Sequence, residues 1–257
     1  IELETGMNRL GFTKKQLSGS LNFLKNNKKY YQLMGVCTHF AGAEHVANYV
    51  RVKEQFRKYR EILTWLRKRG IRPKYRHVAS SAASISFPKS MMDMVRVGIL
   101  QYGFWPSIEI FINYLSENKT TEDPIDRVIS WKSKVMNTRD VKPGEFIGYG
   151  TSYLAKQNMK VAGIPIGYAD GYSRALSNQG RVLVNDARVS VVGTVNMNMV
   201  LADITDVPHA KKGDEVVLIG DQGEHTITVA SFGDMSSLLN YELLTKLSTS
   251  IPRIVIN

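Results

Sequence analysis

A polar stretch near the middle of the chain separates two parts with different hydrophobic patterns. Residues 116–124 have the sequence Ser-Glu-Asn-Lys-Thr-Thr-Glu-Asp-Pro. Before this stretch, strand-like apolar runs alternate with segments of helical periodicity, whereas short apolar runs separated by turn residues follow it. The first pattern favours a parallel α/β architecture, and the second favours a mostly β domain. We therefore expect two domains, residues 1–118 and residues 119–257.

Local signals mark two helices in the first domain. Thr13 and Gln16 have the spacing of a capping box, in which each side chain satisfies a backbone N–H group of the other residue. Apolar residues at spacings of three and four predict an amphipathic helix over residues 43–69, and Gly70 is a suitable end for it. The strands expected in this domain are residues 31–40, 75–83 and 94–104.

The second domain has short strand signals with turn residues between them. The clearest strands are expected at residues 159–166, 181–184, 189–195, 199–204 and 215–219. Asn185 and Asp186 lie between two of these strands and predict a hairpin turn. A final helix is expected over residues 228–239.

Composition and charge exclude several classes of protein. Hydrophobic residues make up 43% of the 257, with no apolar run near the ~20 residues of a membrane helix and no signal-peptide pattern at the start. The single cysteine, Cys37, excludes an internal disulfide and a multi-cysteine zinc site. The formal charge is +11, but the densest basic cluster, residues 51–69, has the apolar stripe of an amphipathic helix. We interpret it as a solvated helix face and expect neither a nucleic-acid nor a membrane partner.

Several polar, glycine-rich or aromatic motifs stand where strands are expected to end, which is where α/β barrels hold their chemistry. The backbone N–H groups of Gly98 and Ile99 suit a phosphate, and Arg9 and Arg96 suit a carboxylate or a ring nitrogen. Tyr149 stands between two glycines, on a turn that lets its hydroxyl reach a neighbour.

The order of these motifs resembles the alanine racemase family from one end of the chain to the other. The stretches that carry the resemblance are Glu4-Thr-Gly-Met-Asn-Arg-Leu-Gly11, Thr38-His-Phe-Ala41, Ala79-Ser-Ser-Ala-Ala83, Val95-Arg-Val-Gly-Ile99, Tyr102-Gly103, Gly148-Tyr-Gly150, Ile166-Gly-Tyr-Ala-Asp-Gly-Tyr172, Val192-Gly-Thr-Val-Asn-Met197, Gly213-Asp-Glu-Val-Val-Leu-Ile-Gly220, Asn240-Tyr-Glu242 and Pro252-Arg253. Any one of these is weak evidence, but their common order is specific.

The resemblance implies a fold, a cofactor and a partner. It implies an α/β plus β fold, in which a TIM-type (β/α)8 barrel that carries pyridoxal 5'-phosphate (PLP) is followed by a mostly β domain. It also implies a homodimer, in which each active site takes its barrel from one subunit and a tyrosine from the β domain of the other. The implied substrate is a small amino acid, alanine, and the implied product D-alanine feeds peptidoglycan synthesis in a bacterial cytoplasm.

Roles follow for residues that match the family's motifs. Tyr149 matches a catalytic base, and His39 and Arg96 match the neighbours that help it lose its proton. Arg96 also matches the arginine that faces the PLP ring nitrogen. The residues that match the family's phosphate cradle are Ser81, Gly98 and Ile99 by their backbone, and Tyr241. Arg9 and Met197 match the groups that orient the substrate, and Tyr168 matches an entrance residue.

Three departures from the family pattern stand out. Asn198 replaces an aspartate, and Glu2 stands where many members carry a carbamylated lysine, so we expect its carboxylate to supply that negative charge for the arginine. The motif with the Schiff-base lysine is not found, so we expect this chain to hold only the C-terminal half of the barrel and to lack the N-terminal part. That part would then be cut away, supplied by a separate N-terminal fragment, or preceded by a fused peptidoglycan-precursor ligase.

Other functions remain open at this stage. The chain could be an inactive remnant or interaction protein, or a racemase that accepts other amino acids. A PLP decarboxylase is disfavoured, because such enzymes use a cysteine in the β domain and the only cysteine is Cys37. Taken alone, His39 is better interpreted as a core histidine, but within the Thr-His-Phe-Ala motif we interpret it as a site residue. We interpret His77 as structural. The histidines and acids show no zinc spacing, so no metal is expected.

Overall fold

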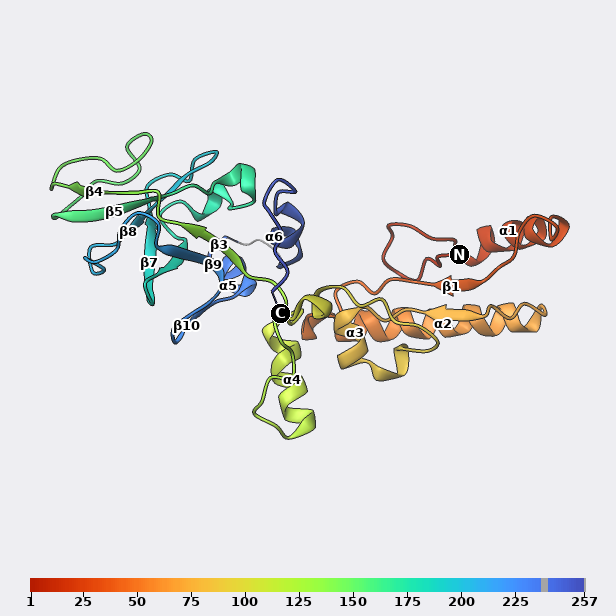
Figure 1. The fold of residues 1–257 in the computed structure, drawn as a ribbon. Coiled ribbons are helices and arrows are strands. Elements are labelled where there is room, and N and C mark those ends of the chain that lie inside the picture. Colours follow the sequence, from red (N-terminus) through yellow and green to blue (C-terminus); the bar gives the residue numbers. More distant parts are fainter. Residues whose placement is uncertain (237–239, 257) are drawn as a thin grey trace. The chain divides into compact units, whose positions relative to one another are not determined.

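The computed structural model describes residues 1–236 and 240–256, and the chain divides into two compact units, Ile1–Asp126 and Arg127–Asn257 (Figure 1). The division follows directly after the polar stretch 116–124. No helix in these described ranges is both long enough and apolar enough to cross a membrane.

Unit 1 combines a short parallel strand pair with α-helices, as its sequence pattern predicts. Its elements are α1 (Lys14–Asn26), β1 (Gly35–Cys37), α2 (Tyr49–Lys68), β2 (Tyr75–His77), α3 (Ser81–Ser86) and α4 (Ile108–Asn118). The strands β1 and β2 are parallel, with Cys37 opposite His77. Isolated parallel bridges continue the pairing from Glu2 to Cys37 and from Ser80 to Arg96.

The predicted helix signals of unit 1 are confirmed, but the helix expected over residues 43–69 begins later, as α2 at Tyr49 after a 3-10 turn at Val46–Asn48. Thr13 caps α1 in the capping box with Gln16. At the other end of α2, Gly70 takes a φ of +73°, and its N–H donates to the Arg67 carbonyl while that of Ile71 donates to Leu66. This is the Schellman arrangement, which a glycine makes easily because it has no Cβ. On the outer face of α2, Arg57 pairs with acidic neighbours one turn away, as expected of a solvated face.

The predicted strands of unit 1 are too long, and one of them is wrong. Only residues 35–37 and 75–77 form strands within the ranges 31–40 and 75–83. The range 94–104 holds a single bridge at Arg96 and then a 3-10 helix, Ile99–Tyr102. The Gly98 N–H donates to the Ser81 hydroxyl at 2.8 Å, so it is not available to a ladder. The apolar run here therefore does not mark a strand, and only Ile99 and Phe104 within it are buried.

Unit 2 is a mostly β domain built on one antiparallel sheet. Its elements are β3 (Trp131–Lys134), β4 (Asn137–Val141), β5 (Met159–Ile164), β6 (Arg181–Val184), β7 (Ala187–Val192), β8 (Val200–Asp203), β9 (Glu215–Gln222), β10 (His225–Ile227), α5 (Val229–Ser236) and α6 (Asn240–Lys246). The strand order is β10-β9-β6-β7-β8-β5-β4, and β3 also pairs with β9. Residues Val216–Gly220 of β9 are buried in succession, which places this strand in the core.

The hairpin predicted at Asn185 and Asp186 is confirmed. Both residues take left-handed φ values, +48° and +63°, and Val184 pairs with Ala187 across the turn. Such a turn matches the natural twist of the two strands that it joins. The helix predicted over 228–239 is observed as α5 up to Ser236, and residues 237–239 lie outside the described residues.

Candidate active site

Arg96 is the centre of a hydrogen-bond network in unit 1. Its Nη1 donates to the His77 carbonyl at 3.2 Å and contacts His77 Nδ1 at 2.5 Å. Its Nη2 donates to the carbonyls of Thr38 at 3.0 Å and Val78 at 3.4 Å and lies 3.3 Å from His39 Nδ1. Because these carbonyls follow β1 and β2, the ends of the parallel strands fix the guanidinium. Its Nε–H makes no hydrogen bond within residues 1–236 and 240–256 and remains a donor for a ligand.

The two histidines beside Arg96 are held in the neutral form. Burial lowers the pKa of His39 below its ordinary value, and the positive charges of Arg96 and Arg9 lower it further. Burial and Arg96 likewise lower the pKa of His77. A neutral imidazole accepts at Nδ1 from a guanidinium, which assigns the proton to Nε2 in both rings.

His77 contacts Arg96, which the sequence interpretation did not predict. We expected a structural role, and its ring and carbonyl both help to hold the Arg96 guanidinium. The available signal was its position, since it ends β2 opposite Cys37, which directly precedes Thr38 and His39. The C-terminal ends of neighbouring parallel strands lie at the same edge of a sheet, so residues at or just after these ends lie close together.

Ser81, Gly98 and Ile99 also come together in unit 1. The Ser81 hydroxyl oxygen accepts from the Gly98 N–H at 2.8 Å, which leaves the hydroxyl proton as a donor. Ser81 is 2% exposed and Ile99 is 1% exposed, so little water competes at this point. The structure thus brings the Ser81 hydroxyl to the Gly98 backbone, and the role of these residues in a phosphate cradle stays a prediction.

Arg9 lies in an exposed turn near the start of the chain. The turn is held by the Glu4 carboxylate, which accepts from the N–H groups of Gly6 and Asn8. Arg9 is close enough to His39 to lower the pKa of that imidazole. In the described part of the chain, no ion pair joins Arg9 to Glu2. The expectation that Glu2 fixes an arginine therefore has no contact to support it.

Unit 2 presents Tyr149 at the tip of a loop. Gly148 and Gly150 on either side take φ values of +81° and +76°, and the Tyr149 side chain is 76% exposed. The loop is packed against residue Gly193, where an added Cβ would lie 2.7 Å from the Ile147 carbonyl oxygen. Only glycine permits this approach, and it fixes the base of the loop while its tip stays open.

Two further predicted residues, Tyr168 and Met197, lie in loops that are bonded to one another. The Tyr168 N–H donates to the Asn196 carbonyl at 3.0 Å, and the Ala169 N–H donates to the Met197 carbonyl at 2.9 Å. Both side chains remain partly exposed, at 43% for Tyr168 and 59% for Met197. Asn198, the departure from the family pattern, is also exposed.

Tyr241 is the last of the predicted residues. It lies near the start of α6, and its side chain is 43% exposed. The segment after α6 approaches Gly171, because the Ser248 N–H donates to the Asp170 carbonyl at 3.3 Å. The predicted site residues thus form two groups, one in each unit.

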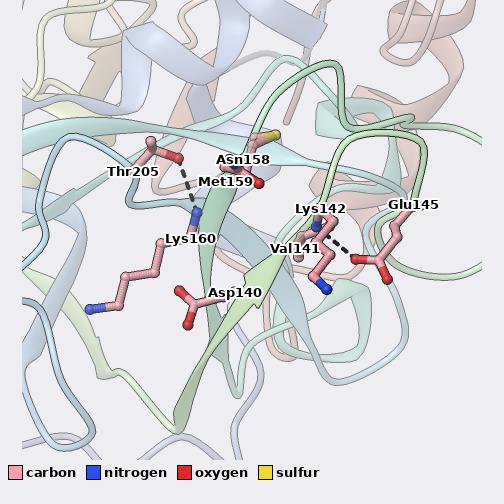
Figure 2. A pocket seen from close by; sticks show the side chains of 8 residues that line it. All are labelled: Asp140, Val141, Lys142, Glu145, Asn158, Met159, Lys160 and Thr205. Carbon is pink, nitrogen blue, oxygen red and sulfur yellow. Dashed lines mark hydrogen bonds between the residues drawn. The ribbon is translucent and has the colours of Figure 1, made fainter.

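Figure 2 shows a different hollow in unit 2, which none of the predicted residues lines. The Lys160 N–H donates to the Thr205 hydroxyl at 3.1 Å, and the Lys142 N–H donates to the Glu145 carboxylate at 2.7 Å. The Lys160 ammonium donates to the Pro208 carbonyl at 2.7 Å. These polar groups serve local turns, so the hollow has no set of converging groups for chemistry. No cluster of metal-ligating side chains is found within residues 1–236 and 240–256.

Comparison with known proteins decides the family. The model of the alanine racemase C-terminal domain matches residues 128–255, and the model of the N-terminal domain matches residues 1–106. The alanine racemase of Carboxydothermus hydrogenoformans is 36% identical over 256 residues, which are 100% of this chain and 67% of that protein. The chain belongs to the alanine racemase family.

Other relatives agree over the full length of the chain. The alanine racemase of Leptospira interrogans is 36% identical over 258 residues, and this chain spans 65% of its length. The crystal structure of alanine racemase from Bacillus anthracis with bound L-Ala-P has a TM-score of 0.88 and 35% identity, with 100% of this chain and 64% of that chain covered. The family's fold, a barrel-type domain followed by a β domain, is therefore shared.

These comparisons correct one set of expectations. Residues 1–106 match the N-terminal domain model, so the expectation of a chain that lacks the family's N-terminal part is not borne out. Both domains are represented, and not only the C-terminal half of the barrel. The comparisons also give no support to an absent Schiff-base lysine, a fused ligase, a separate N-terminal fragment or an inactive remnant.

Proposed function

We propose that this protein interconverts L-alanine and D-alanine with PLP as its cofactor. Membership of the alanine racemase family gives the reaction class. The observation that carries the proposal is the guanidinium of Arg96, which the carbonyls of Thr38, His77 and Val78 hold in one orientation. A donor fixed in this way is suited to one defined acceptor.

The donor set of unit 1 fits PLP. The ring nitrogen of the cofactor needs a single donor, and the Nε–H of Arg96 is available. The phosphate needs several donors, and the Ser81 hydroxyl with the Ile99 backbone offers them at a buried position, with Tyr241 as a further donor in unit 2. When bound, PLP supplies a conjugated ring that spreads the negative charge left on Cα after its proton is removed.

Arg96 sets the character of that ring. A guanidinium has a pKa far above neutrality and does not give up its proton, so the ring nitrogen beside it stays unprotonated. A weaker electron sink favours return of the proton to Cα over transamination.

Tyr149 acts as the base on one face of the substrate. A tyrosine hydroxyl has a pKa of ~10, so it needs a nearby positive charge to lose its proton at neutral pH. Arg96 is the neighbour proposed to supply that charge, and the neutral His39, whose proton is on Nε2, is proposed to donate a hydrogen bond to the phenolate. Arg9 and the Met197 backbone N–H orient the substrate carboxylate, and Tyr168 lines the entrance. A second base protonates Cα from the opposite face, which completes a two-base racemisation.

We further propose a homodimer in which Tyr149 of one subunit completes the site of the other. The exposure of the Tyr149 side chain, at 76%, supports a role outside its own unit. The product, D-alanine, supplies peptidoglycan synthesis in the bacterial cytoplasm.

The test is racemisation of alanine in D2O by the protein supplied with PLP. Both enantiomers should form and should carry deuterium at Cα, because each base exchanges its proton with solvent. Arg96→Gln should abolish this exchange, whereas Arg76→Gln, which breaks only the ion pair with Asp93, should preserve it. Release of CO2 and an amine would identify a decarboxylase instead, and no deuterium uptake would reject the proposal.

A further inference from the structure

Gln55 is a fully buried polar side chain on the inner face of α2. It is 1% exposed, among apolar residues that pack against the strands. Its Oε1 accepts from the Ala41 N–H at 2.8 Å, and its Nε2 donates to the His39 carbonyl at 3.0 Å and to the Thr5 hydroxyl at 3.4 Å. Since an N–H group needs an acceptor and a carbonyl needs a donor, these partners fix the orientation of the amide.

The hydrogen bonds continue from Gln55 to two other segments. Thr38 donates its hydroxyl proton to the Leu3 carbonyl at 2.8 Å. The Thr5 and Thr38 hydroxyls lie 2.8 Å apart, so Thr5 must be the donor of this pair. The result is one directed chain from the Gln55 amide through Thr5 and Thr38 to Leu3. Thr38 is a member of that chain, and its own backbone carbonyl accepts from Arg96.

We propose that Gln55 is the positioning residue that sets the His39 loop against Arg96 and ties it to the segment carrying Arg9. This inference rests on the proposed function, in which His39, Arg96 and Arg9 belong to the site. The amide clamps both sides of Phe40, by the carbonyl before it and the N–H after it, and so determines where the His39 backbone lies. His39 then has its imidazole 3.3 Å from the guanidinium.

The residue type is required by the partners. A glutamate at this position would accept from Ala41 but could not donate to the His39 carbonyl or the Thr5 hydroxyl. A methionine would fill a similar volume and make none of the three bonds. Each unpaired group in so buried a place is costly, so the loop is expected to move until water reaches it.

The experiment is a titration of the His39 imidazole by NMR in the full chain, without PLP or alanine. The groups that act on His39 are Arg96, Arg9, Glu2 and Glu44 in addition to burial. In Gln55→Met the loop should loosen, so that His39 gains solvent and lies farther from Arg96. Both changes raise the pKa of His39, by roughly 0.5 or more. The Ala41 amide should also exchange with solvent at least about tenfold faster.

Ile62→Val is the matched control. Ile62 lies on the same inner face of α2 and is 7% exposed, so its truncation weakens the same packing but removes none of the hydrogen bonds of Gln55. It should leave the pKa of His39 and the exchange of Ala41 unchanged. Thr5→Val is the second variant, in case Gln55→Met does not fold. It cuts the chain at one link and should shift the pKa of His39 in the same direction by less.

The outcomes separate this inference from the proposed function. An unchanged pKa of His39 in Gln55→Met, or an equal shift in Ile62→Val, would overturn the positioning role whether or not the protein racemises alanine. Conversely, a protein that racemises nothing can still show the shift, and then only the proposed function fails. Where racemisation is observed, Gln55→Met should lower kcat/KM about tenfold relative to Ile62→Val, because a displaced His39 no longer supports the base.

Discussion

Two fully buried tyrosines, one in each unit, differ in whether their hydroxyls have a partner. Tyr59 donates to the Val36 carbonyl at 2.6 Å. Tyr172 is 0% exposed, and its hydroxyl has no hydrogen-bond partner within the described residues. Burial raises the pKa of both phenols, so both are neutral hydroxyls at every working pH. Replacement by phenylalanine therefore removes a hydrogen bond in one case and an unpaired polar group in the other.

The expected changes in the free energy of unfolding have opposite signs. Tyr59→Phe loses the hydrogen bond to the Val36 carbonyl, which costs about 1–1.5 kcal/mol. The Tyr172 hydroxyl loses its hydration on folding and gains no hydrogen-bond partner within the described residues. Its removal in Tyr172→Phe should therefore raise the free energy of unfolding by about 1 kcal/mol or more. The hydroxyl lies against Gly180, so a small void offsets part of this gain. We expect Tyr172→Phe to stabilise unit 2 by about 0.5–1 kcal/mol.

The assay is equilibrium urea unfolding monitored by hydrogen exchange, because the exchange of individual amides reports the stability of each unit separately. Protein and cofactor concentrations must be equal for all variants, because ligand binding and subunit association shift apparent stability. The two variants should differ by about 2 kcal/mol. A loss of about 1 kcal/mol or more in Tyr172→Phe would refute the reasoning, since it would mean that a bound water or a moved side chain pairs with the hydroxyl.

Three further predictions follow from local geometry. The pKa values of His39 and His77 are lowered in the folded protein, so as the pH falls below about 6.5 the unfolded chain takes up protons first. The free energy of unfolding of unit 1 should therefore fall with the pH until the folded pKa values are reached, by up to about 1.4 kcal/mol per pH unit for each histidine. Urea unfolding at pH 5 and pH 8 measures this, and greater stability at pH 5 would contradict it. Asp186→Gly should stabilise the β6–β7 hairpin by about 0.5 kcal/mol, since residue 186 has a φ of +63°, and a lower urea midpoint would argue against this turn. Ser81→Ala removes the acceptor of the Gly98 N–H and a proposed phosphate donor, so PLP affinity measured by fluorescence titration should fall about tenfold; unchanged affinity would exclude Ser81 from the cradle.

The parts of the fold that the sequence predicts well are those fixed by neighbouring residues. The capping box at Thr13, the glycine end of α2 and the turn at Asn185 depend on a few adjacent side chains, and all three are observed. The range 94–104 was predicted wrongly as a strand because its hydrogen bonds go to Ala79 and Ser81, which the local pattern does not reveal.

The same distinction applies to the candidate site. Motif order identified Arg96, Ser81 and Gly98, and the structure brings Ser81 and Gly98 into contact. The contact of His77 with Arg96 depends on the bridge between Ser80 and Arg96, a long-range pairing that composition and spacing could not give. Gln55 did leave a signal, because it is a polar residue at a position of the apolar stripe of α2.

The pairing of β3 with β9 sets an order of events during synthesis on the ribosome. β3 ends at Lys134 and forms its ladder with β9, which begins only at Glu215. Until β9 has left the exit tunnel, Trp131 has no neighbouring strand to cover it, and the hairpin of β6 and β7 waits for the same partner. If the ribosome pauses after β3 and before β9, β3 is unpaired and the Trp131 side chain is exposed to solvent. In this interval we expect the nascent chain to be most prone to chaperone binding and to aggregation.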